Sequence, residues 1–317
     1  MTLRSRTYTS HSPFELFNHH LSPITMDRAS RLRQAQQLGP MLDTIWQRAM
    51  QVPFLDNKPM DGPPSCTEQD FKLPHLRRCT FDFNTIIWER KLGGGLDGYV
   101  WKVWFGETGP FALKVFWDTE APDFRHYYAA QRECQNAAVF QMIEAAIAQA
   151  AVESRSIRVL ANPTTKQEAR YNLFWFSDEA RLASFPEDLE AAEVKSMPRF
   201  KKCYGWLKFS GEVLKSLPMK LRAQPRTVSK IKRSISSSKE YTAIVYEYVE
   251  EGENDEAAVE DVDRFCWLTG FSHNLSPAAR NWKSGVLVDL ADIVHARGYG
   301  WHEATYKPWT AEMILVE

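Results

Sequence analysis

The chain has 317 residues, of which 44% are hydrophobic and 25% are charged. This composition is typical of a globular protein and excludes a wholly disordered, collagen-like or small disulfide-rich chain. Its 39 Lys and Arg residues balance 40 Asp and Glu residues, and the net charge of −1 excludes a protein whose whole surface attracts nucleic acid or an anionic membrane.

Five cysteines are widely spaced, and none forms a C-x-x-C pair. This spacing indicates neither a zinc site nor a disulfide framework, so we expect free thiols in a reducing compartment, the nucleus or the cytoplasm. The N-terminus lacks the apolar stretch of a secretory signal, and polar side chains interrupt the apolar segment 137–152. The sequence therefore predicts no membrane segment.

Residues 1–80 are predicted to form a flexible arm, a short helix over 41–50 and a linker. The helix is predicted from apolar side chains that share one face. Prolines and an Asp-Gly pair then interrupt the chain between residues 53 and 64, which is typical of a linker.

Residues 81–250 are predicted to form a sheet with one long helix over 123–152 and two insertions, near 153–197 and 213–239. Strands are predicted from β-branched and aromatic runs separated by turn residues over 83–92, 99–105, 111–117, 200–209 and 241–249. A further strand over 171–176 is expected within the first insertion.

Residues 251–317 begin with an acidic stretch, after which a short helix is expected. Apolar spacing predicts a longer helix over 277–296. The chain then ends in a loop and a strand-like Ile-Leu-Val segment. The fold class predicted for the whole chain is α+β.

A glycine-rich hairpin is the first candidate site. Gly93, Gly95 and Gly98 precede Val100 in a G-x-G-x-x-G-x-V pattern between two predicted strands. Glycines allow a backbone to lie close to phosphates, because a Cβ atom would hold the ligand away. The second strand argues against a Rossmann unit, where a helix follows the glycines. An ordinary hairpin turn is the alternative.

A lysine and a glutamate form the second candidate site. Lys114 follows Ala112 and is the single charge of an apolar strand, while Glu133 lies on the long predicted helix. A carboxylate there would hold the lysine ammonium in position and keep it protonated. A purely structural salt bridge is the alternative.

The glycine loop, the strand lysine and the helix glutamate follow one another in the order found in protein kinases. This part of the chain therefore resembles the amino-terminal lobe of a protein kinase. The resemblance implies a five-stranded antiparallel sheet with one prominent helix, and ATP as cofactor. It implies that Tyr246 is the gatekeeper and that the Glu247 carbonyl and the Val249 N–H face an adenine. It also implies that residues 284–295 form the helix before the catalytic loop.

The catalytic elements depart from the kinase pattern. The nearest match to H-R-D is His302-Glu303-Ala304, in which alanine replaces the catalytic aspartate, and no D-F-G follows before Glu317. These changes argue against magnesium binding and against catalysis. Residues 251–317 are then expected to be a partial helical carboxy-terminal lobe that ends at a degenerate catalytic loop. His302 is also readily explained as a loop residue packed against a neighbouring tryptophan.

Over residues 80–317 the chain diffusely resembles a fungal kinetochore subunit family called Fta-two. This resemblance implies a non-catalytic, pseudokinase-like scaffold with protein partners in a nuclear assembly. The alternatives are an active ATP-dependent kinase, with His302 or Glu303 as base, and a truncated product of a kinase gene. The basic side chains over 220–239 are typical of a solvated loop, and a contact with an acidic partner or with nucleic acid is the weaker alternative.

Overall fold

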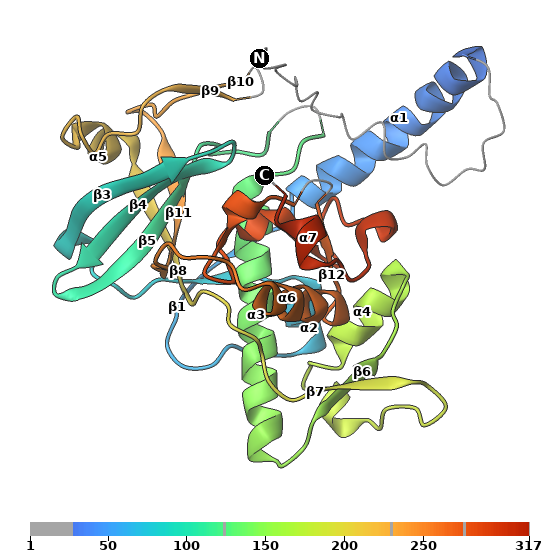
Figure 1. The fold of residues 1–317 in the computed structure, drawn as a ribbon. Coiled ribbons are helices and arrows are strands. Elements are labelled where there is room, and N and C mark those ends of the chain that lie inside the picture. Colours follow the sequence, from blue (N-terminus) through green and yellow to red (C-terminus); the bar gives the residue numbers. More distant parts are fainter. Residues whose placement is uncertain (1–27, 123–124, 229–230, 275–276, 317) are drawn as a thin grey trace, which may run out of the picture.

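The computed structural model describes residues 28–122, 125–228, 231–274 and 277–316. Its main element is a mixed sheet of seven strands (Figure 1). In spatial order these are β1 (Leu55–Pro59), β2 (Leu76–Arg78), β8 (Cys203–Ser210), β11 (Glu240–Glu247), β5 (Thr108–Phe116), β4 (Gly98–Phe105) and β3 (Ile86–Gly94). β1, β2 and β8 are mutually parallel, and the other neighbours are antiparallel. The α+β class is confirmed.

The five strands from β8 to β3 match the strands expected from the sequence. The expectation that the sheet has five strands is wrong, because β1 and β2 extend it to seven. Residues 53–64, interpreted as a linker, contain β1, which lies at the sheet edge. An edge strand tolerates proline because one side of its backbone needs no ladder partner. β2 then joins β1 to β8, with Arg78 opposite Trp206.

Seven α-helices accompany the sheet in the described part of the chain. They are α1 (Arg28–Met50), α2 (Glu68–Lys72), α3 (Ala129–Val152), α4 (Lys166–Phe174), α5 (Gly211–Ser216), α6 (Glu256–Leu268) and α7 (Ala311–Ile314). α1 is longer than the predicted helix 41–50, and its residues 28–38 belong to the segment expected to be a flexible arm. α3 begins at Ala129 rather than Asp123, and residues 123–124 lie outside the described residues.

Two predicted strands are helices in the structure. The segment 171–176 falls largely in α4, whose first turn is closed by a capping box between Thr165 and Glu168. The terminal Ile-Leu-Val segment lies in and after α7. In both places a run of apolar side chains predicts a strand, but a short buried helix produces the same kind of run.

The predicted helix over 277–296 is wrong, and so is the expectation of a helix over 284–295. This segment forms one short hairpin, two 3-10 turns and a strand that pairs with an earlier strand. Its elements are η4 (Ala279–Asn281), β13 (Trp282–Lys283), β14 (Val286–Leu287), η5 (Leu290–Asp292) and β15 (Ile293–His295). β13 pairs with β14, and β15 pairs with β12 (Phe271–His273). Ser284 and Gly285, both with positive φ, form the β13–β14 turn and interrupt any helix.

The insertions also carry regular structure. β6 (Ile157–Leu160) pairs with β7 (Ala191–Val194) in the first, and η3 (Ala180–Leu182) lies between them. α5 begins the second insertion, in which β9 (Arg226–Val228) pairs with β10 (Ile231–Arg233). η2 (Phe83–Thr85) precedes β3, and η6 (Glu303–Thr305) precedes α7.

The core has two parts, one on each face of the sheet. Leu113 and Val115 of β5 belong to the cluster on one face, whereas Phe116 belongs to the cluster around α3 on the other. Because successive strand side chains alternate between faces, Lys114 projects towards α3. Figure 1 shows α3 running through the middle of the molecule, between the sheet and the carboxy-terminal elements.

Candidate functional site

The glycine hairpin joins β3 to β4 beside β5. Gly95 N–H donates to the Gly98 carbonyl at 2.9 Å and closes the hairpin. A Cβ atom on Gly98 would lie 2.4 Å from the Val115 carbonyl oxygen, so close contact between β4 and β5 requires glycine there. A Cβ atom on Gly95 would meet nothing within 4 Å. Packing against β5 therefore explains why residue 98 is a glycine. Packing does not require glycine at position 95, where a contact with a ligand stays a prediction.

Two residues outside the hairpin, Trp117 and Tyr127, hold its tip in place. Trp117 donates from its backbone N–H to the Asp97 carbonyl and from its indole Nε1 to the Gly95 carbonyl, each at 3.0 Å. The Tyr127 hydroxyl donates to Asp97 Oδ1 at 2.7 Å. Burial raises the pKa of Asp97 to about 6, against the opposing charge of Lys114. The tip thus places a carboxyl group close enough to Lys114 for their charges to interact.

Lys114 lies at the centre of the site, where it is buried. Its Nζ atom lies 2.6 Å from Glu133 Oε2 and 2.8 Å from Asp289 Oδ1. Burial would lower the pKa of Lys114, but Asp289 and Glu133 together hold it well above 10.5. The predicted Lys114–Glu133 pair is present, and Asp289 is an additional partner that the sequence did not predict.

Asp289 reaches Lys114 because α3 anchors the segment that carries it. Buried Asn136 donates from Nδ2 to the carbonyls of Leu290 and Ile293, at 2.8 and 2.7 Å. Asp289 Oδ1 also accepts the N–H of Ala291 at 3.1 Å, which caps η5. Burial would raise the pKa of Asp289, but Lys114 and its hydrogen bond hold that pKa below 3.8. Asp289 is therefore an ionised carboxylate at a fixed position.

A second buried lysine completes the charge group. Lys201 Nζ donates to the Val288 carbonyl at 2.7 Å and lies 3.7 Å from Glu133 Oε1. It also lies 3.3 Å from the centre of the Tyr246 ring, a cation–π contact. Burial lowers the pKa of Lys201 to about 8. The sequence does not distinguish Lys201 from its neighbour Lys202, so the burial of Lys201 could not be predicted.

The segment between β12 and β13 lies next to Asp289. The Asn274 N–H donates to the Asp292 carbonyl at 2.7 Å, and its Nδ2 donates to the Ala291 carbonyl at 2.7 Å. Asn281 Nδ2 donates to Asp292 Oδ2. Burial, together with the charge of Asp289, raises the pKa of Asp292 to about 7. Residues 274–281 contain two asparagines and no carboxylate.

The predicted catalytic candidates His302 and Glu303 make other contacts. His302 is the N-cap of η6, where its Nδ1 accepts the Ala304 N–H at 3.1 Å. Glu303 Oε1 accepts the Lys166 N–H at 3.1 Å, at the start of α4. Both side chains thus cap helical turns: His302 caps η6, and Glu303 caps the start of α4.

The predicted adenine-binding residues lie at and after the end of β11. Tyr246 is fully buried between Lys201 and the core. The Glu247 carboxylate pairs with Arg199 and accepts the Lys202 N–H at 3.1 Å. Val249 follows the strand and is half-buried. The structure places Tyr246 beside the Lys201 ammonium, a neighbour that the sequence did not reveal.

Val100 and Ala112 lie on the two strands that flank the hairpin and Lys114. Val100 is opposite Lys114 in the β4–β5 register, and Ala112 is opposite Lys102. Ala112 is half-buried and packs against the cluster around α3. The two residues therefore belong to the same stretch of sheet as the charge group.

The basic run 220–239 makes specific contacts at its β9–β10 hairpin. Arg226 donates to the Gly94 carbonyl, and Arg233 pairs with Asp118. Two of its charges are thus engaged with the protein itself, beside the glycine hairpin. This arrangement supports a structural role for these two side chains.

Other site types find little support in the described ranges. No group of three or more His, Cys, Asp or Glu side chains there is close enough to hold a metal ion. No helix of the described residues has the length and apolar character needed to cross a bilayer. All five cysteines are free, in agreement with the expectation of unpaired thiols. No known family model matches the chain, and no curated protein is detectably related to it.

Proposed function

We propose that this chain is a kinase-like protein that binds a nucleoside triphosphate at Lys114 and acts as a binding or scaffold component rather than as a phosphotransferase. The observation that carries the proposal is the buried Lys114 held between Glu133 and Asp289 beneath a glycine hairpin. In kinases a strand lysine paired with a helix glutamate contacts nucleotide phosphates, and an aspartate after the catalytic loop holds magnesium.

The order of elements around Asp289 supports this comparison. In chain order there is a strand, a loop with asparagines, a two-strand hairpin, Asp289 and a strand that returns to the first. In this scheme the counterpart of the catalytic loop is residues 274–281, and Asp289 is the counterpart of the D-F-G aspartate. Residues 302–304, which the sequence predicts as the counterpart of the catalytic loop, have no part in this scheme.

Magnesium would enter such a site together with the nucleotide. Mg²⁺ is commonly held by one or two protein carboxylates plus phosphate oxygens. Asp289 would supply a carboxylate oxygen and Asn281 an amide oxygen to the ion. These two ligands are too few for Mg²⁺ alone, so phosphate oxygens would have to supply others. A metal bound in this way would neutralise phosphate charge next to Lys114.

Phosphoryl transfer requires a base that accepts the proton of the attacking hydroxyl. The loop 274–281 carries asparagines where a kinase carries that aspartate, and an amide cannot accept the proton. Asp263, the carboxylate nearest in sequence before this loop, already accepts from His273 Nε2 and from the Trp309 N–H, each at 2.7 Å. These features favour binding without transfer.

Isothermal titration of the full chain with ATP and ADP, with and without Mg²⁺, tests the binding step. We expect Lys114→Met to weaken nucleotide binding at least about tenfold, because a charge-assisted contact to phosphate is lost. Asp289→Asn is expected to abolish the effect of Mg²⁺ while leaving metal-free binding measurable. Lys102→Met, a lysine of β4 paired with Glu89, is the matched control. Equal affinity in Lys114→Met and the native chain would overturn the proposal.

An active kinase is the second candidate, and Asp292 is the observation that favours it. The pKa of this carboxyl, raised to about 7, suits a general base at neutral pH. Transfer of radiolabelled phosphate that is lost in both Lys114→Met and Asp292→Asn would establish catalysis and remove the scaffold-only proposal. Unchanged transfer in both variants would point to a contaminating kinase.

The resemblance to the Fta-two family extends the proposal to a nuclear protein assembly such as the kinetochore. Its test is co-purification of the tagged full chain from nuclei. Recovery of the chain alone, without centromere proteins, would count against this extension and leave the nucleotide proposal intact.

A further inference from the structure

The first turn of α3 carries a buried arginine, Arg132, directly before Glu133. Its Nη1 atom donates to Asn274 Oδ1 at 3.1 Å and to the Ala291 carbonyl at 3.2 Å. Its Nη2 atom donates to the Tyr299 carbonyl at 3.2 Å. Arg132 therefore connects α3 to three points of the carboxy-terminal elements, which lie beside α3 in Figure 1.

These contacts place Arg132 next to the segment that carries Asp289. The Ala291 N–H donates to Asp289 Oδ1 at 3.1 Å, so Arg132 holds the carbonyl of a residue that itself positions this carboxylate. Asn274 Nδ2 donates to the same Ala291 carbonyl at 2.7 Å. Loss of Arg132 would therefore loosen both the loop 274–281 and Asp289.

The guanidinium group of Arg132 is also linked to the glycine hairpin. It lies over the Tyr127 ring, with its Cζ atom 3.8 Å from the ring centroid. The Tyr127 hydroxyl in turn donates to Asp97 Oδ1, at the tip of the hairpin, at 2.7 Å. Closely packed interiors transmit displacements, because few voids separate their side chains. A single ring thus connects Arg132 with the hairpin tip.

The geometry of arginine explains why this side chain occupies the position. The hydrogen bonds of Arg132 go to two backbone carbonyls and one amide oxygen, in three different segments. A planar guanidinium group has five donors in a fixed arrangement and can stack on a ring at the same time, whereas a lysine ammonium is a point charge. A Cβ atom on Gly300 would lie 2.9 Å from Arg132 Nη2, so glycine there leaves room for the group.

We propose that Arg132 is a positioning residue that couples the glycine hairpin to the loop 274–281 and to Asp289, so that the two halves of the site become ordered together. The functional meaning of this coupling rests on the proposed nucleotide site, in which phosphates lie beneath the hairpin and magnesium lies at Asp289. The coupling itself is a property of the chain without ligand. It is reciprocal, so ordering of either half favours ordering of the other.

The test is amide hydrogen exchange of the ¹⁵N-labelled full chain, measured by NMR without nucleotide and corrected for any change in global stability. The N–H groups of Gly95 and Trp117, the hairpin amides, report on the hairpin. The N–H groups of Asn274 and Ala291, the loop amides, report on the other half. We expect Arg132→Met to raise the exchange rate of all four about tenfold, which is within the usual range for coupled sites.

Two variants of Tyr127 test the same coupling with Arg132 unchanged. Tyr127→Leu removes the ring beneath the guanidinium group and should raise the exchange rates of the hairpin amides and of the loop amides. Tyr127→Phe keeps the ring and removes only the hydrogen bond to Asp97, so it should raise the exchange rates of the hairpin amides alone. The Tyr127 variants also decide the question if Arg132→Met does not fold.

A first control separates this coupling from a general loosening of the contacts between α3 and the carboxy-terminal elements. Asn136, one turn beyond Arg132 on α3, donates to the carbonyls of Leu290 and Ile293. Asn136→Ala therefore loosens the loop side while the stack of Arg132 on Tyr127 stays in place. It should raise the exchange rates of the loop amides and leave those of the hairpin amides unchanged.

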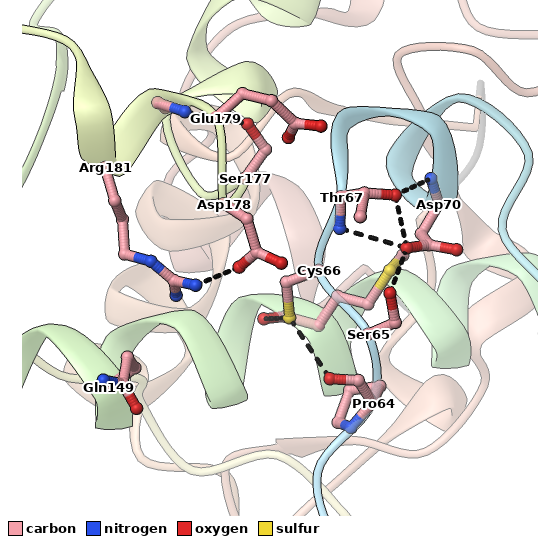
Figure 2. A network of polar contacts seen from close by, with 12 residues as sticks. Pro64, Ser65, Cys66, Thr67, Asp70, Gln149, Ser177, Asp178, Glu179 and Arg181 are labelled. Carbon is pink, nitrogen blue, oxygen red and sulfur yellow. Dashed lines mark hydrogen bonds and ion pairs between the residues drawn. The ribbon is translucent and has the colours of Figure 1, made fainter.

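A second control acts at a distant point of α3. The Cys66 thiol donates to the Met142 carbonyl at 3.5 Å, about 15 Å along the helix from Arg132. Figure 2 shows Cys66 beside α3 in this region, close to Asp178. Cys66→Ala should leave the exchange rates of both sets of amides unchanged.

Native exchange rates of the hairpin amides in both Arg132→Met and Tyr127→Leu would overturn the proposal. Native rates in Arg132→Lys would show that the charge alone suffices, and would overturn the role given to the guanidinium geometry. Added ADP should slow exchange of both sets of amides in the native chain, but only of the hairpin amides in Arg132→Met. Failure to bind ADP would overturn the proposed function alone, because the rates of the free chain still decide the role of Arg132.

Discussion

Lys201 places its ammonium nitrogen 3.3 Å from the centre of the Tyr246 ring, between that ring and the Val288 carbonyl. The same nitrogen lies 3.7 Å from Glu133 Oε1, so Glu133 is shared by two buried lysines. Lys201 adds a second cation to the Lys114–Glu133 pair, and Asp289 adds a second carboxylate. The site therefore has two cations against two carboxylates, before the nearby Asp97 is counted.

Because of Lys201, the stability of the protein is expected to change with pH in the alkaline range. The pKa of Lys201 is lowered from 10.5 to about 8, so between these values the unfolded chain binds a proton that the folded chain lacks. Stability contributed through Lys201 therefore rises with pH across that window, by an amount on the order of 3 kcal/mol. We expect Lys201→Met to remove this rise in urea unfolding measured from pH 7 to 10.5. Lys202→Met, its exposed neighbour, should retain the native pH slope.

Glu133→Gln is expected to destabilise the fold by about 3 kcal/mol, because it leaves the Lys114 and Lys201 cations buried with one carboxylate fewer. Urea unfolding at pH 7 measures the effect. The double variant Lys114→Met/Glu133→Gln should lose less than the sum of the two single losses, since removal of both partners leaves fewer unpaired charges. Additive losses would show that the two side chains do not interact.

Gly98→Ala and Gly95→Ala form a matched pair in the hairpin. The Cβ atom at position 98 would lie 2.4 Å from the Val115 carbonyl, so β4 and β5 must separate, at a cost of roughly 2 kcal/mol. The Cβ atom at position 95 meets nothing within 4 Å and should change unfolding free energy by less than about 0.5 kcal/mol. If the hairpin lies over phosphates, Gly95→Ala should nevertheless weaken nucleotide binding. Equal stability of the two variants would contradict the packing explanation of Gly98.

Asp97→Asn should strengthen nucleotide binding about fivefold at pH 7, because it removes a negative charge near the proposed phosphate position. The pKa of Asp97 is raised to about 6, so below that value the native carboxyl is already neutral. The difference in ADP affinity between native chain and variant should therefore shrink as the pH falls from 7 to 5. A constant difference across this range would show that Asp97 acts through hairpin geometry, since the amide also alters the contact with Tyr127.

The Lys114–Glu133 pair was predictable because each residue carries its own local signal. Lys114 is the single charge in an apolar strand, and period-two alternation directs it to one face. Glu133 shares a helix face with buried apolar residues. Each pattern spans fewer than ten residues, and the pair joins neighbouring elements in the chain.

Asp289 could not be placed in the same way. Its contact with Lys114 joins positions 175 residues apart, through a segment whose apolar residues also match a helix. The Ser284-Gly285 turn was the available signal against that helix. Lys201 was missed for a different reason: only the tertiary structure distinguishes it from exposed Lys202. Capping-box residues at Thr165 and Glu168 were a readable signal for α4.

The pairing of β2 with β8 has a consequence for handling the protein. Without residues 55–78, β8 would become the edge of the sheet and present unpaired backbone groups to solvent. Such an edge is a template on which a second chain can add a strand. A fragment that starts at residue 81, although it contains the hairpin, Lys114 and Glu133, would therefore self-associate through β8. The short strands β1 and β2 act as the molecule's own protection against aggregation.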